Sequence, residues 1–317
     1  MNVAPASADA LTFRPYRPGD ETAILALFSA SFGKEMSEAY WRWRYLDNPV
    51  AGPMIELAWD GGHLAAHYAV SPVMLAVDGV LMRAALSMTT MTDPGYRGRG
   101  LFPLMAERLY GRLREAGYGL VFGFPNVQSH RIFARDLGWL DLAPVPVMSV
   151  VLDALRGPPD LGGSVREEPG FGAWVEDIAV PPDGIGLMRS VDYLTWRFRA
   201  EPTHRYRLLV ARDRARAAGY LVAKSFEDNL DIVDLYSEEA ALPALIAHAA
   251  SLATASGARR LTTWMPVYDP LFGGLERMGF QAGGPVTYMG GRVLPAAGSD
   301  LFDPRRWHVS MAMSDVF

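Results

Sequence analysis

The segment Arg97-Gly98-Arg99-Gly100 combines residue types that can bind an anion, and apolar residues at helical spacing follow it directly. Glycine lets the backbone approach a ligand closely and adopt positive φ angles. The first N–H groups of a helix have no partner within the helix, and their partial positive charge suits a phosphate or pyrophosphate. Two arginines add full positive charge. The segment therefore predicts an anion site at the start of a helix.

Gly-x-Gly also occurs in simple tight turns, and two other phosphate motifs share its glycines. A dinucleotide-binding fingerprint would need a third glycine near position 103, where this sequence has Pro103. A Walker A loop would need Gly-Lys followed by Ser or Thr, and the sequence does not contain it. We therefore expect neither of these two phosphate sites.

The elements that must position this segment can be predicted from turn signals and from the period of the apolar residues. Asp60-Gly61-Gly62 and Asp78-Gly79 each predict a hairpin between two strands. In chain order we expect a strand at Leu11–Tyr16 and a helix capped by Asp20, with Ile24, Leu27, Phe28 and Phe32 on one face. Four strands should follow, at Met54–Trp59, Leu64–Val70, Val73–Val77 and Leu81–Met91. The remaining elements are a helix from Leu101 to Gly117, a strand at Tyr118–Phe124, a helix at Asn126–Leu137 and a strand at Val145–Leu152. This order predicts a mixed α/β domain.

Two short signatures occur twice in the same order, which indicates an internal duplication. The motif Tyr-x-x-Trp-Arg-aromatic-x-x-x-Pro begins at Tyr40 and again at Tyr193, 153 residues later (193 − 40). A proline followed 13 residues later by Gly-aromatic occurs at Pro125 and again at Pro266, 141 residues later (266 − 125). The second copy is therefore 12 residues shorter between these landmarks (153 − 141).

The stretch from Gly157 to Gly186 is crowded with Pro-Pro, Gly-Gly and Pro-Gly pairs, which break both helices and strands. We place the boundary between the copies there. The expected organisation is an N-terminal domain at residues 1–155, a linker at 156–186, and a second domain with a C-terminal tail at 187–317. We expect each domain to be a mixed, mostly antiparallel sheet flanked by helices, so the fold class is mixed α/β (α+β).

The order of elements and the Gly-x-Gly segment resemble the GNAT superfamily of acyl-CoA-dependent N-acyltransferases. In that family the loop between strand 4 and helix 3 usually reads Gln/Arg-x-x-Gly-x-Gly/Ala, and its backbone amides hold the pyrophosphate of coenzyme A. Gly98 and Gly100 fill the two glycine positions, Gly95 replaces the usual Gln or Arg, and Phe102 replaces a frequent later glycine. The family pattern after strand 5 is also present, as Asn126, Ser129, Phe133 and Gly138-Trp139.

The resemblance implies acetyl-CoA, or another short acyl-CoA, as co-substrate. It assigns the binding of this molecule to Met91, Thr92, Arg97, Gly98, Arg99, Gly100, Leu101, Phe102, Asn126 and Ser129. A backbone N–H of strand 4, around Met91 to Asp93, is expected to polarise the thioester carbonyl. Many family members use a tyrosine near Phe133 to protonate the leaving thiolate, and a phenylalanine cannot do this.

The attacking amine must lose a proton, so a base or a chain of waters is needed. The motif does not assign this base. The candidates are Asp93, Glu56 and His67, with His130 and Asp315 as further ones. Each of the first three also has a structural interpretation, because Asp93 can cap a turn, Glu56 can face outward from its strand and His67 can be a satisfied core histidine.

The offset of 141 residues places Glu238-Glu239-Ala240-Ala241 where the first copy has Arg97-Gly98-Arg99-Gly100. Two carboxylates at a pyrophosphate site would repel the ligand. We therefore expect the second copy not to bind coenzyme A, and to shape the acceptor pocket or stabilise the first domain instead. The aromatic cluster Trp41, Trp43 and Tyr45 recurs in that copy, which favours a packing role over an acceptor platform.

The composition narrows the class of protein. The chain has 317 residues, a net charge of −5 and no cysteine. The absence of cysteine excludes disulfides and a Cys-acyl intermediate. The negative charge argues against a broad nucleic-acid surface. No apolar run approaches the length of a membrane span, and no signal peptide is apparent. We therefore expect a cytoplasmic protein, monomeric or homodimeric, with no metal site and no nucleic-acid or membrane partner.

Together these observations predict an enzyme that transfers an acyl group from acetyl-CoA, or a related acyl-CoA, to a primary amine of a small molecule by direct attack. Two-copy chains with the Trp-Arg-aromatic signature resemble enzymes that acylate amino sugars, often nucleotide-linked ones. Two alternatives stay open. One is a non-catalytic acyl-CoA-binding or sensor protein. The other is an aminoacyl-tRNA-dependent transferase of tandem-GNAT shape, against which both the net charge and the Gly-x-Gly loop argue.

Overall fold

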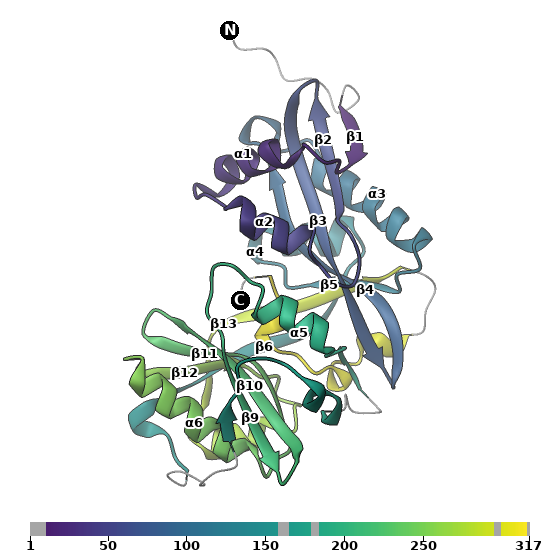
Figure 1. The fold of residues 1–317 in the computed structure, drawn as a ribbon. Coiled ribbons are helices and arrows are strands. Elements are labelled where there is room, and N and C mark those ends of the chain that lie inside the picture. The colour runs from purple at the N-terminus through teal and green to yellow at the C-terminus, as the bar shows by residue number, and fades with distance from the viewer. Residues whose placement is uncertain (1–10, 158–164, 179–183, 295–298, 316–317) are drawn as a thin grey trace. The chain divides into compact units, whose positions relative to one another are not determined.

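The computed structural model of the chain describes residues 11–157, 165–178, 184–294 and 299–315. The chain divides into two compact units (Figure 1). The first, here called the N unit, comprises residues 1–74, 82–141 and 290–298, and the second, the C unit, comprises residues 75–81, 142–289 and 299–317. These ranges differ from the predicted ranges 1–155, 156–186 and 187–317, because each unit contains a segment from the other half of the chain.

The N unit is built on a mixed sheet whose central strands carry the predicted anion loop. Its strand order is β1 (Thr12–Pro15), β2 (Met54–Asp60), β3 (His63–Val77), β4 (Val80–Thr92), β5 (Leu120–Gly123) and the end of β13 (Gln281–Val293). Strands β4 and β5 are parallel, whereas β1–β2, β2–β3 and β5–β13 are antiparallel. This arrangement agrees with the predicted mixed, mostly antiparallel sheet.

Helices cover both faces of the N-unit sheet. On one face, α1 (Glu21–Phe32) and α2 (Glu38–Tyr45) bury Ile24, Trp41 and Tyr45 against the strands. On the other face, α3 (Leu101–Glu115) and α4 (Val127–Asp136) bury their apolar residues in a second cluster. The sheet therefore separates the two hydrophobic cores of this unit (Figure 1), and residues 93–100 connect the end of β4 to the start of α3.

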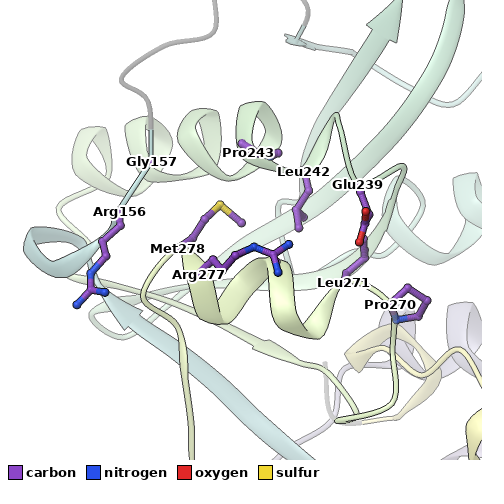
Figure 2. A pocket seen from close by; sticks show the side chains of 10 residues that line it. Arg156, Gly157, Glu239, Leu242, Pro243, Pro270, Leu271, Arg277 and Met278 are labelled. Atoms are coloured by element: carbon purple, nitrogen blue, oxygen red, sulfur yellow. The ribbon is translucent and has the colours of Figure 1, made fainter.

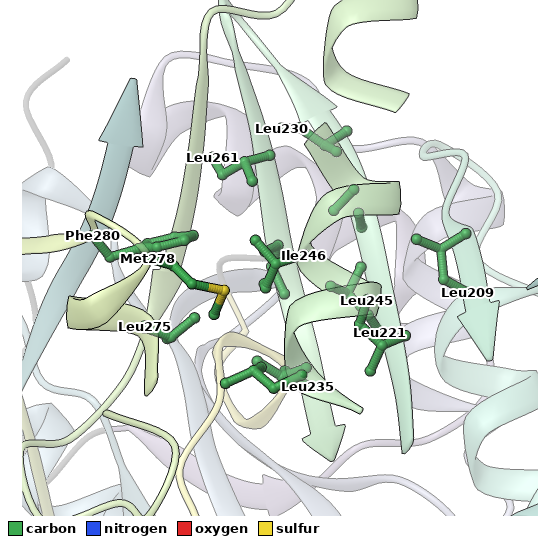
Figure 3. Packing of buried hydrophobic residues seen from close by; sticks show 14 of the residues in the cluster. Leu209, Leu221, Leu230, Leu235, Leu245, Ile246, Leu261, Leu275, Met278 and Phe280 are labelled. Carbon is green, nitrogen blue, oxygen red and sulfur yellow. The ribbon is translucent and has the colours of Figure 1, made fainter. Parts of the chain in front are cut away.

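The C unit repeats this plan. Its strand order is β6 (Leu140–Val151), β12 (Arg260–Trp264), β11 (Asn229–Ser237), β10 (Arg216–Phe226), β9 (Arg207–Asp213) and β7 (Val165–Glu167), with β11 and β12 parallel. Helices α6 (Leu242–Ala255) and α7 (Phe272–Arg277) pack on one face over a core of leucine, isoleucine, methionine and phenylalanine side chains (Figure 3). Helix α5 (Val191–Phe198) also belongs to this unit.

The described part of the predicted linker contains regular structure. Strand β7 pairs with β9, and β8 (Ile185–Leu187) pairs with Leu75–Val77 at the end of β3, all within the C unit. A short 3-10 turn covers Ala173–Asp177. Proline and glycine pairs therefore do not prevent the residues between them from adding strands to the sheet.

Each unit contains one strand from the other half of the sequence. In the N unit the antiparallel neighbour of β5 is Gly290–Val293 of β13, from the second half of the chain. In the C unit the antiparallel neighbour of β12 is Val147–Val151 of β6, from the first half. This exchange explains why each compact unit contains residues from both halves of the sequence.

Two hairpins, one in each unit, share their strand register. In the β2–β3 hairpin Leu57 lies opposite His67, and in the β9–β10 hairpin Val210 lies opposite Tyr220, each residue 153 positions later (210 − 57, 220 − 67). Both hairpins then shift register by one residue, at Ala65 in the first copy and at Ala218, again 153 positions later (218 − 65), in the second. The repeat seen in two short motifs thus extends to the pairing of individual residues.

Several predicted elements need correction. The two strands expected at Leu64–Val70 and Val73–Val77 are one continuous strand, β3. Phe32 is about half exposed, so it does not share the buried face of α1 with Ile24. The side chain of Asp20 makes no cap hydrogen bond to α1, because it pairs with Arg14 at 2.7 Å.

Candidate acyl-CoA site

The predicted anion loop connects β4 to α3 as residues 93–100. Asp93 opens it, with its Oδ1 accepting a hydrogen bond from Gly95 N at 2.8 Å. Gly98 and Gly100 have φ angles of 77° and 69°, and α3 begins at the next residue. A Cβ atom on either glycine would meet no atom within 4 Å, so the positive φ, and not crowding, makes glycine necessary. The backbone in front of the helix is therefore open to a ligand.

The arginines of the loop are held close to it. The guanidinium of Arg99 lies 4.6 Å from the ring centroid of Tyr96 and donates to Gly95 O at 2.9 Å. Arg97 is exposed and its Nε lies 3.4 Å from Thr92 O. Tyr96 in turn donates to Asp60 Oδ2 at 2.7 Å. The loop thus carries two guanidinium groups beside the free N–H groups of the helix start, which is the electrostatic requirement for binding a pyrophosphate.

Other predicted coenzyme contacts have capping or core roles. Asn126 Oδ1 accepts from Gln128 N at 3.0 Å and from Ser129 N at 2.9 Å, which caps α4. The side chains of Leu101 and Phe102 are buried in the core beneath α3, so only their backbone faces the loop. Met91 is buried as well, and Thr92 is partly exposed at the end of β4.

Two of the candidate bases are engaged in local contacts. Asp93 caps the turn and lies 3.3 Å from His63 Nε2 through its second carboxylate oxygen. Glu56 is almost fully buried, and its two oxygens lie 2.8 Å from Arg108 and 2.9 Å from Arg112 of α3. The expectation that Glu56 faces outward is therefore incorrect, since two guanidinium groups balance its charge inside the unit.

The remaining candidates differ in their surroundings. His67 is completely buried in β3, with Nδ1 at 3.0 Å from the carbonyl oxygen of Thr89 in β4. Its Nε2 is buried and has no hydrogen-bond partner among the described residues. Burial lowers the pKa of His67 to about 4, so the imidazole is neutral at pH 7. His130 pairs with Asp141 at 2.7 Å, and Asp315 is half-buried in the C unit.

The position of the usual tyrosine acid is part of the core. Phe133 packs at 5.1 Å from the ring of Phe102 and at 4.2 Å from that of Trp139. Beneath it Tyr110 accepts a hydrogen bond from Trp139 at 3.0 Å and lies 3.1 Å from the hydroxyl of Tyr68. Burial raises the pKa of Tyr68 to about 12. Sequence patterns did not point to these two tyrosines, because buried hydroxyls leave no periodic signal.

The corresponding loop of the C unit has a different length and backbone. Glu238 N donates to Ala218 O at 2.9 Å, as Asp93 N donates to Ala65 O at 2.9 Å in the N unit. From these residues to the helix start the C unit has four residues, 238–241, where the N unit has eight, 93–100. Ala241, before α6, has φ −89° and ψ −20°. The C-unit loop therefore lacks both the length and the positive φ angles of the anion loop.

A cavity of about 240 Å³ lies at this end of the C unit, between the start of α6 and α7 (Figure 2). Its wall combines apolar side chains with charged ones of both signs, from Arg156, Glu239, Leu242, Pro243, Pro270, Leu271, Arg277 and Met278. Glu238 points elsewhere, because it pairs with Arg216 at 2.6 Å. One of the two predicted carboxylates thus lines the cavity, and the other has a cationic partner.

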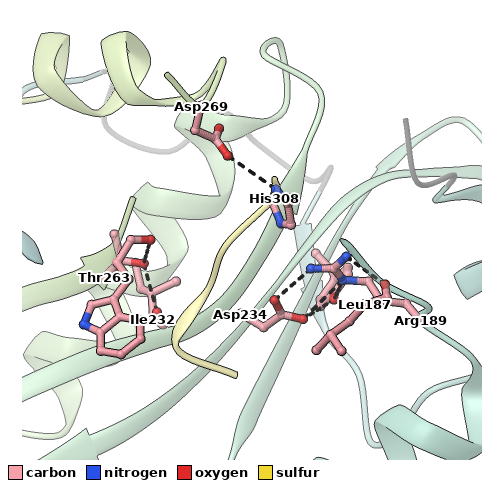
Figure 4. Close-up of polar contacts among 9 residues, drawn as sticks. Leu187, Arg189, Ile232, Asp234, Thr263, Asp269 and His308 are labelled. Carbon is pink, nitrogen blue, oxygen red and sulfur yellow. Dashed lines mark hydrogen bonds and ion pairs between the residues drawn. The ribbon is translucent and has the colours of Figure 1, made fainter. Parts of the chain in front are cut away.

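A buried polar cluster joins strands β10 and β11 to Arg189 (Figure 4). Arg189 donates to Asp234 Oδ1 at 3.1 Å and to the hydroxyl of Tyr220 at 2.6 Å, and Tyr220 donates to Asp234. Burial opposes the ionisation of Asp234, but Arg189 outweighs it and holds the pKa of this carboxyl below its ordinary value. His308 lies 3.3 Å from Asp269 nearby. The only available sequence signal was an aspartate within an apolar strand.

Comparison with known proteins finds a family model and solved structures that are similar to this chain. The model of the acetyltransferase (GNAT) domain matches residues 12–140. A GCN5-related N-acetyltransferase from Kribbella flavida has the same fold, with a TM-score of 0.70 and 19% identity over 92% of this chain and 73% of that chain. A second one, from Anabaena variabilis ATCC 29413, has a TM-score of 0.69 and 14% identity over 90% of this chain and 73% of that chain. A protein from Enterococcus faecalis V583, described as a probable N-acyltransferase, is similar at TM-score 0.69 and 13% identity over 90% of this chain and 73% of that chain. No curated protein sequence matches.

Residues 12–140 therefore match a GNAT acetyltransferase domain, the family predicted from Gly98 and Gly100. Enzymes of this family take an acyl-CoA as co-substrate and need an acceptor, so the domain supports an acyl-transfer function. In the described ranges no helix is long and apolar enough to cross a membrane. Residues 11–157, 165–178, 184–294 and 299–315 contain no group of three or more His, Asp or Glu side chains arranged to hold a metal ion.

Proposed function

We propose that the protein transfers an acyl group from acetyl-CoA, or another short acyl-CoA, to the primary amine of a small molecule at the N unit. The observation that carries this proposal is the loop before α3, where two glycines with positive φ leave the helix start open beside Arg97 and Arg99. This geometry suits the pyrophosphate of coenzyme A. An amino sugar, including a nucleotide-linked one, is the acceptor class that we would examine first.

The chemistry requires one bond to form and one to break. The neutral amine attacks the thioester carbonyl, and the C–N bond forms as the C–S bond breaks and releases the coenzyme A thiolate. The amine loses a proton and the thiolate gains one. We propose that backbone N–H groups of β4 stabilise the negative charge that develops on the carbonyl oxygen. Phe133 itself cannot donate a proton, so we propose that solvent protonates the thiolate.

We propose that the C unit is a second GNAT-like copy that does not bind coenzyme A at its own loop. The common hairpin register supports the duplication, and the four-residue loop with Glu239 at the helix start supports the loss of binding. On this basis the single acyl-CoA site of the protein belongs to the N unit.

The test is isothermal titration of acetyl-CoA into the wild type and into a Gly98→Glu, Gly100→Glu double variant. Wild-type binding should be lost in the double variant, because the substitutions strain the loop and place two carboxylates at the anion site. Ala241→Glu is the matched control in the C unit, and it should bind as the wild type does. Absence of binding by a folded wild type would contradict the proposal.

Release of free thiol from acetyl-CoA in the presence of amines then separates the functional classes. Turnover with an amino sugar or another small amine supports the transferase. Binding without turnover across a panel of amines would favour the acyl-CoA sensor. Transfer that requires aminoacyl-tRNA would identify the third class.

A further inference from the structure

Thr89 has an unusual backbone conformation for its position. Four described residues other than glycine have positive φ, and three of them, Asp78, Arg214 and Glu227, lie in hairpin turns. Thr89, with φ 33°, lies inside strand β4. A β-branched residue rarely adopts such an angle, and a strained residue persists only where its surroundings hold it. A neighbouring group must therefore fix the backbone of β4 at this point.

His67 is that group. Its Nδ1 lies 3.0 Å from the carbonyl oxygen of Thr89. A carbonyl oxygen can only accept, so Nδ1 carries the proton and Nε2 carries the lone pair. The ring also lies edge-on to Tyr45, at 6.1 Å between centroids. Since the side chain is completely buried and neutral, the contact is shielded from solvent and from competition by water.

The C unit has a comparable anchor at the equivalent place. Tyr220 occupies the register position of His67, and it reaches across to Asp234 of β11. The pairing of β10 with β11 shifts register directly beyond Asp234. In both units, a side chain at this position of β3 or β10 thus contacts the neighbouring strand beside an irregular point, which is the positive φ of Thr89 in β4 and the register shift next to Asp234 in β11. The two anchors differ because the C unit uses an ion-paired carboxylate and the N unit uses a backbone carbonyl.

We propose that His67 is a positioning residue, whose Nδ1–H holds the Thr89 carbonyl and thereby sets the direction of the backbone amides that follow in β4. The proposal rests on the proposed function, because Thr90 to Thr92 lead directly into the acyl-CoA loop. A small change in the direction of a donor weakens the stabilisation of a developing oxyanion strongly, by about 100-fold or more in rate when a donor is lost.

Three substitutions separate this role from that of a base. The amide nitrogen of an asparagine lies close to the position of Nδ1, and that of a glutamine lies close to Nε2. We expect His67→Asn to keep kcat within about threefold of the wild type. His67→Gln and His67→Phe should lower kcat by about 10- to 100-fold and leave the KM for acetyl-CoA within about twofold. Melting temperature and circular dichroism establish that each variant is folded.

Two kinetic outcomes would overturn the proposal. If His67→Asn loses as much activity as His67→Phe, the Nε2 lone pair is required and His67 acts as a base. If folded His67→Phe keeps the wild-type kcat, the anchor has no role in the reaction.

A measurement without turnover separates this proposal from the proposed function. The ¹⁵N chemical shifts of His67 should report a neutral ring with the proton on Nδ1 between pH 5.5 and 8, whether or not any acyl-CoA is used. A protein that shows this tautomer and no acyl transfer would contradict the proposed function and leave the anchor in place. A protein that transfers acyl groups and carries the proton on Nε2 would contradict the anchor alone.

Discussion

The N unit and the C unit share a register and differ in what their strands and loops hold. Strand β3 shifts register at Ala65, and β10 shifts register at the equivalent Ala218. In each unit the carbonyl oxygen of this alanine accepts a hydrogen bond from the first N–H of the loop. Beyond that bond the N unit has eight residues with two positive φ angles, and the C unit has four. The two units therefore share the hairpin register but not the length or the backbone conformation of the loop.

The two units also differ in the hydrogen-bond partners of the equivalent buried residues His67 and Tyr220. His67 is a neutral ring with one unpartnered nitrogen, whereas Tyr220 belongs to a cluster in which Arg189 and Asp234 balance each other. Burying a neutral nitrogen without a hydrogen-bond partner has a cost, and burying a charge costs far more unless its partner remains. The C-unit cluster therefore links its strands through a balanced charge pair, whereas His67 links β3 to β4 through one hydrogen bond.

The largest effect should come from breaking the C-unit ion pair. Arg189→Leu leaves Asp234 buried without its cation, and we expect a loss of about 3–5 kcal/mol in the free energy of unfolding. The double variant Arg189→Leu, Asp234→Leu should recover most of this loss, because no charge remains buried. Arg207→Leu, which removes a surface partner of Glu167, is the matched control and should cost less than about 1 kcal/mol. Equal costs for Arg189→Leu and Arg207→Leu in urea unfolding would contradict the assignment.

The next effect is a pH dependence that belongs to the N unit. The pKa of His67 is about 4 in the folded chain and about 6.5 in the unfolded chain. Between these values the unfolded state binds a proton that the folded state does not, so stability should fall as the pH falls from 6.5 to 4. The shift corresponds to about 3 kcal/mol. His67→Asn cannot titrate there, so the difference between wild type and variant should change by this amount between pH 7 and pH 4. A constant difference would mean that His67 is solvated.

The sequence predicted what depends on local chemistry. Asp60-Gly61-Gly62 sets the β2–β3 hairpin, and Gly98 and Gly100 set the loop, because a turn that needs positive φ selects glycine whatever surrounds it. Helix α3 follows from the spacing of its buried residues, Leu101, Met105, Leu109 and Leu113. These elements carry their own signals within a few residues.

The rest depends on contacts between distant residues. Nothing in the sequence of β13 indicates that Gly290–Val293 would pair with β5, since the choice of partner strand is made by the whole sheet. Glu56 looks like an outward-facing residue until α3 brings Arg108 and Arg112 onto it, 52 and 56 positions away (108 − 56, 112 − 56). The contact of His67 with Thr89 likewise requires knowledge of the φ angle of Thr89.

A smaller effect should come from exchanging residue types between the two loops. Gly98→Ala forces an L-residue into a left-handed conformation, at a cost of about 1–2 kcal/mol. If the loop relaxes to avoid this cost, the affinity for acetyl-CoA should fall about tenfold, measured by calorimetry. Ala241→Gly is the reciprocal change in the C unit. It should create no second binding event, because the loop there remains too short. Two acetyl-CoA molecules bound per Ala241→Gly chain would show that glycine alone restores the site.

The smallest effect tests how equal the copies remain outside the site. Ser37 caps α2 by accepting from Tyr40 N at 3.1 Å, and Ser190 caps α5 by accepting from Tyr193 N at 3.2 Å. Because the two caps have the same geometry, Ser37→Ala and Ser190→Ala should each destabilise their helix by about 1 kcal/mol. Amide hydrogen exchange in α2 and α5 measures each cost separately. Similar values would mean that the two caps contribute equally to their helices. A cost confined to Ser37→Ala would mean that the C unit holds α5 by tertiary packing and not by its cap.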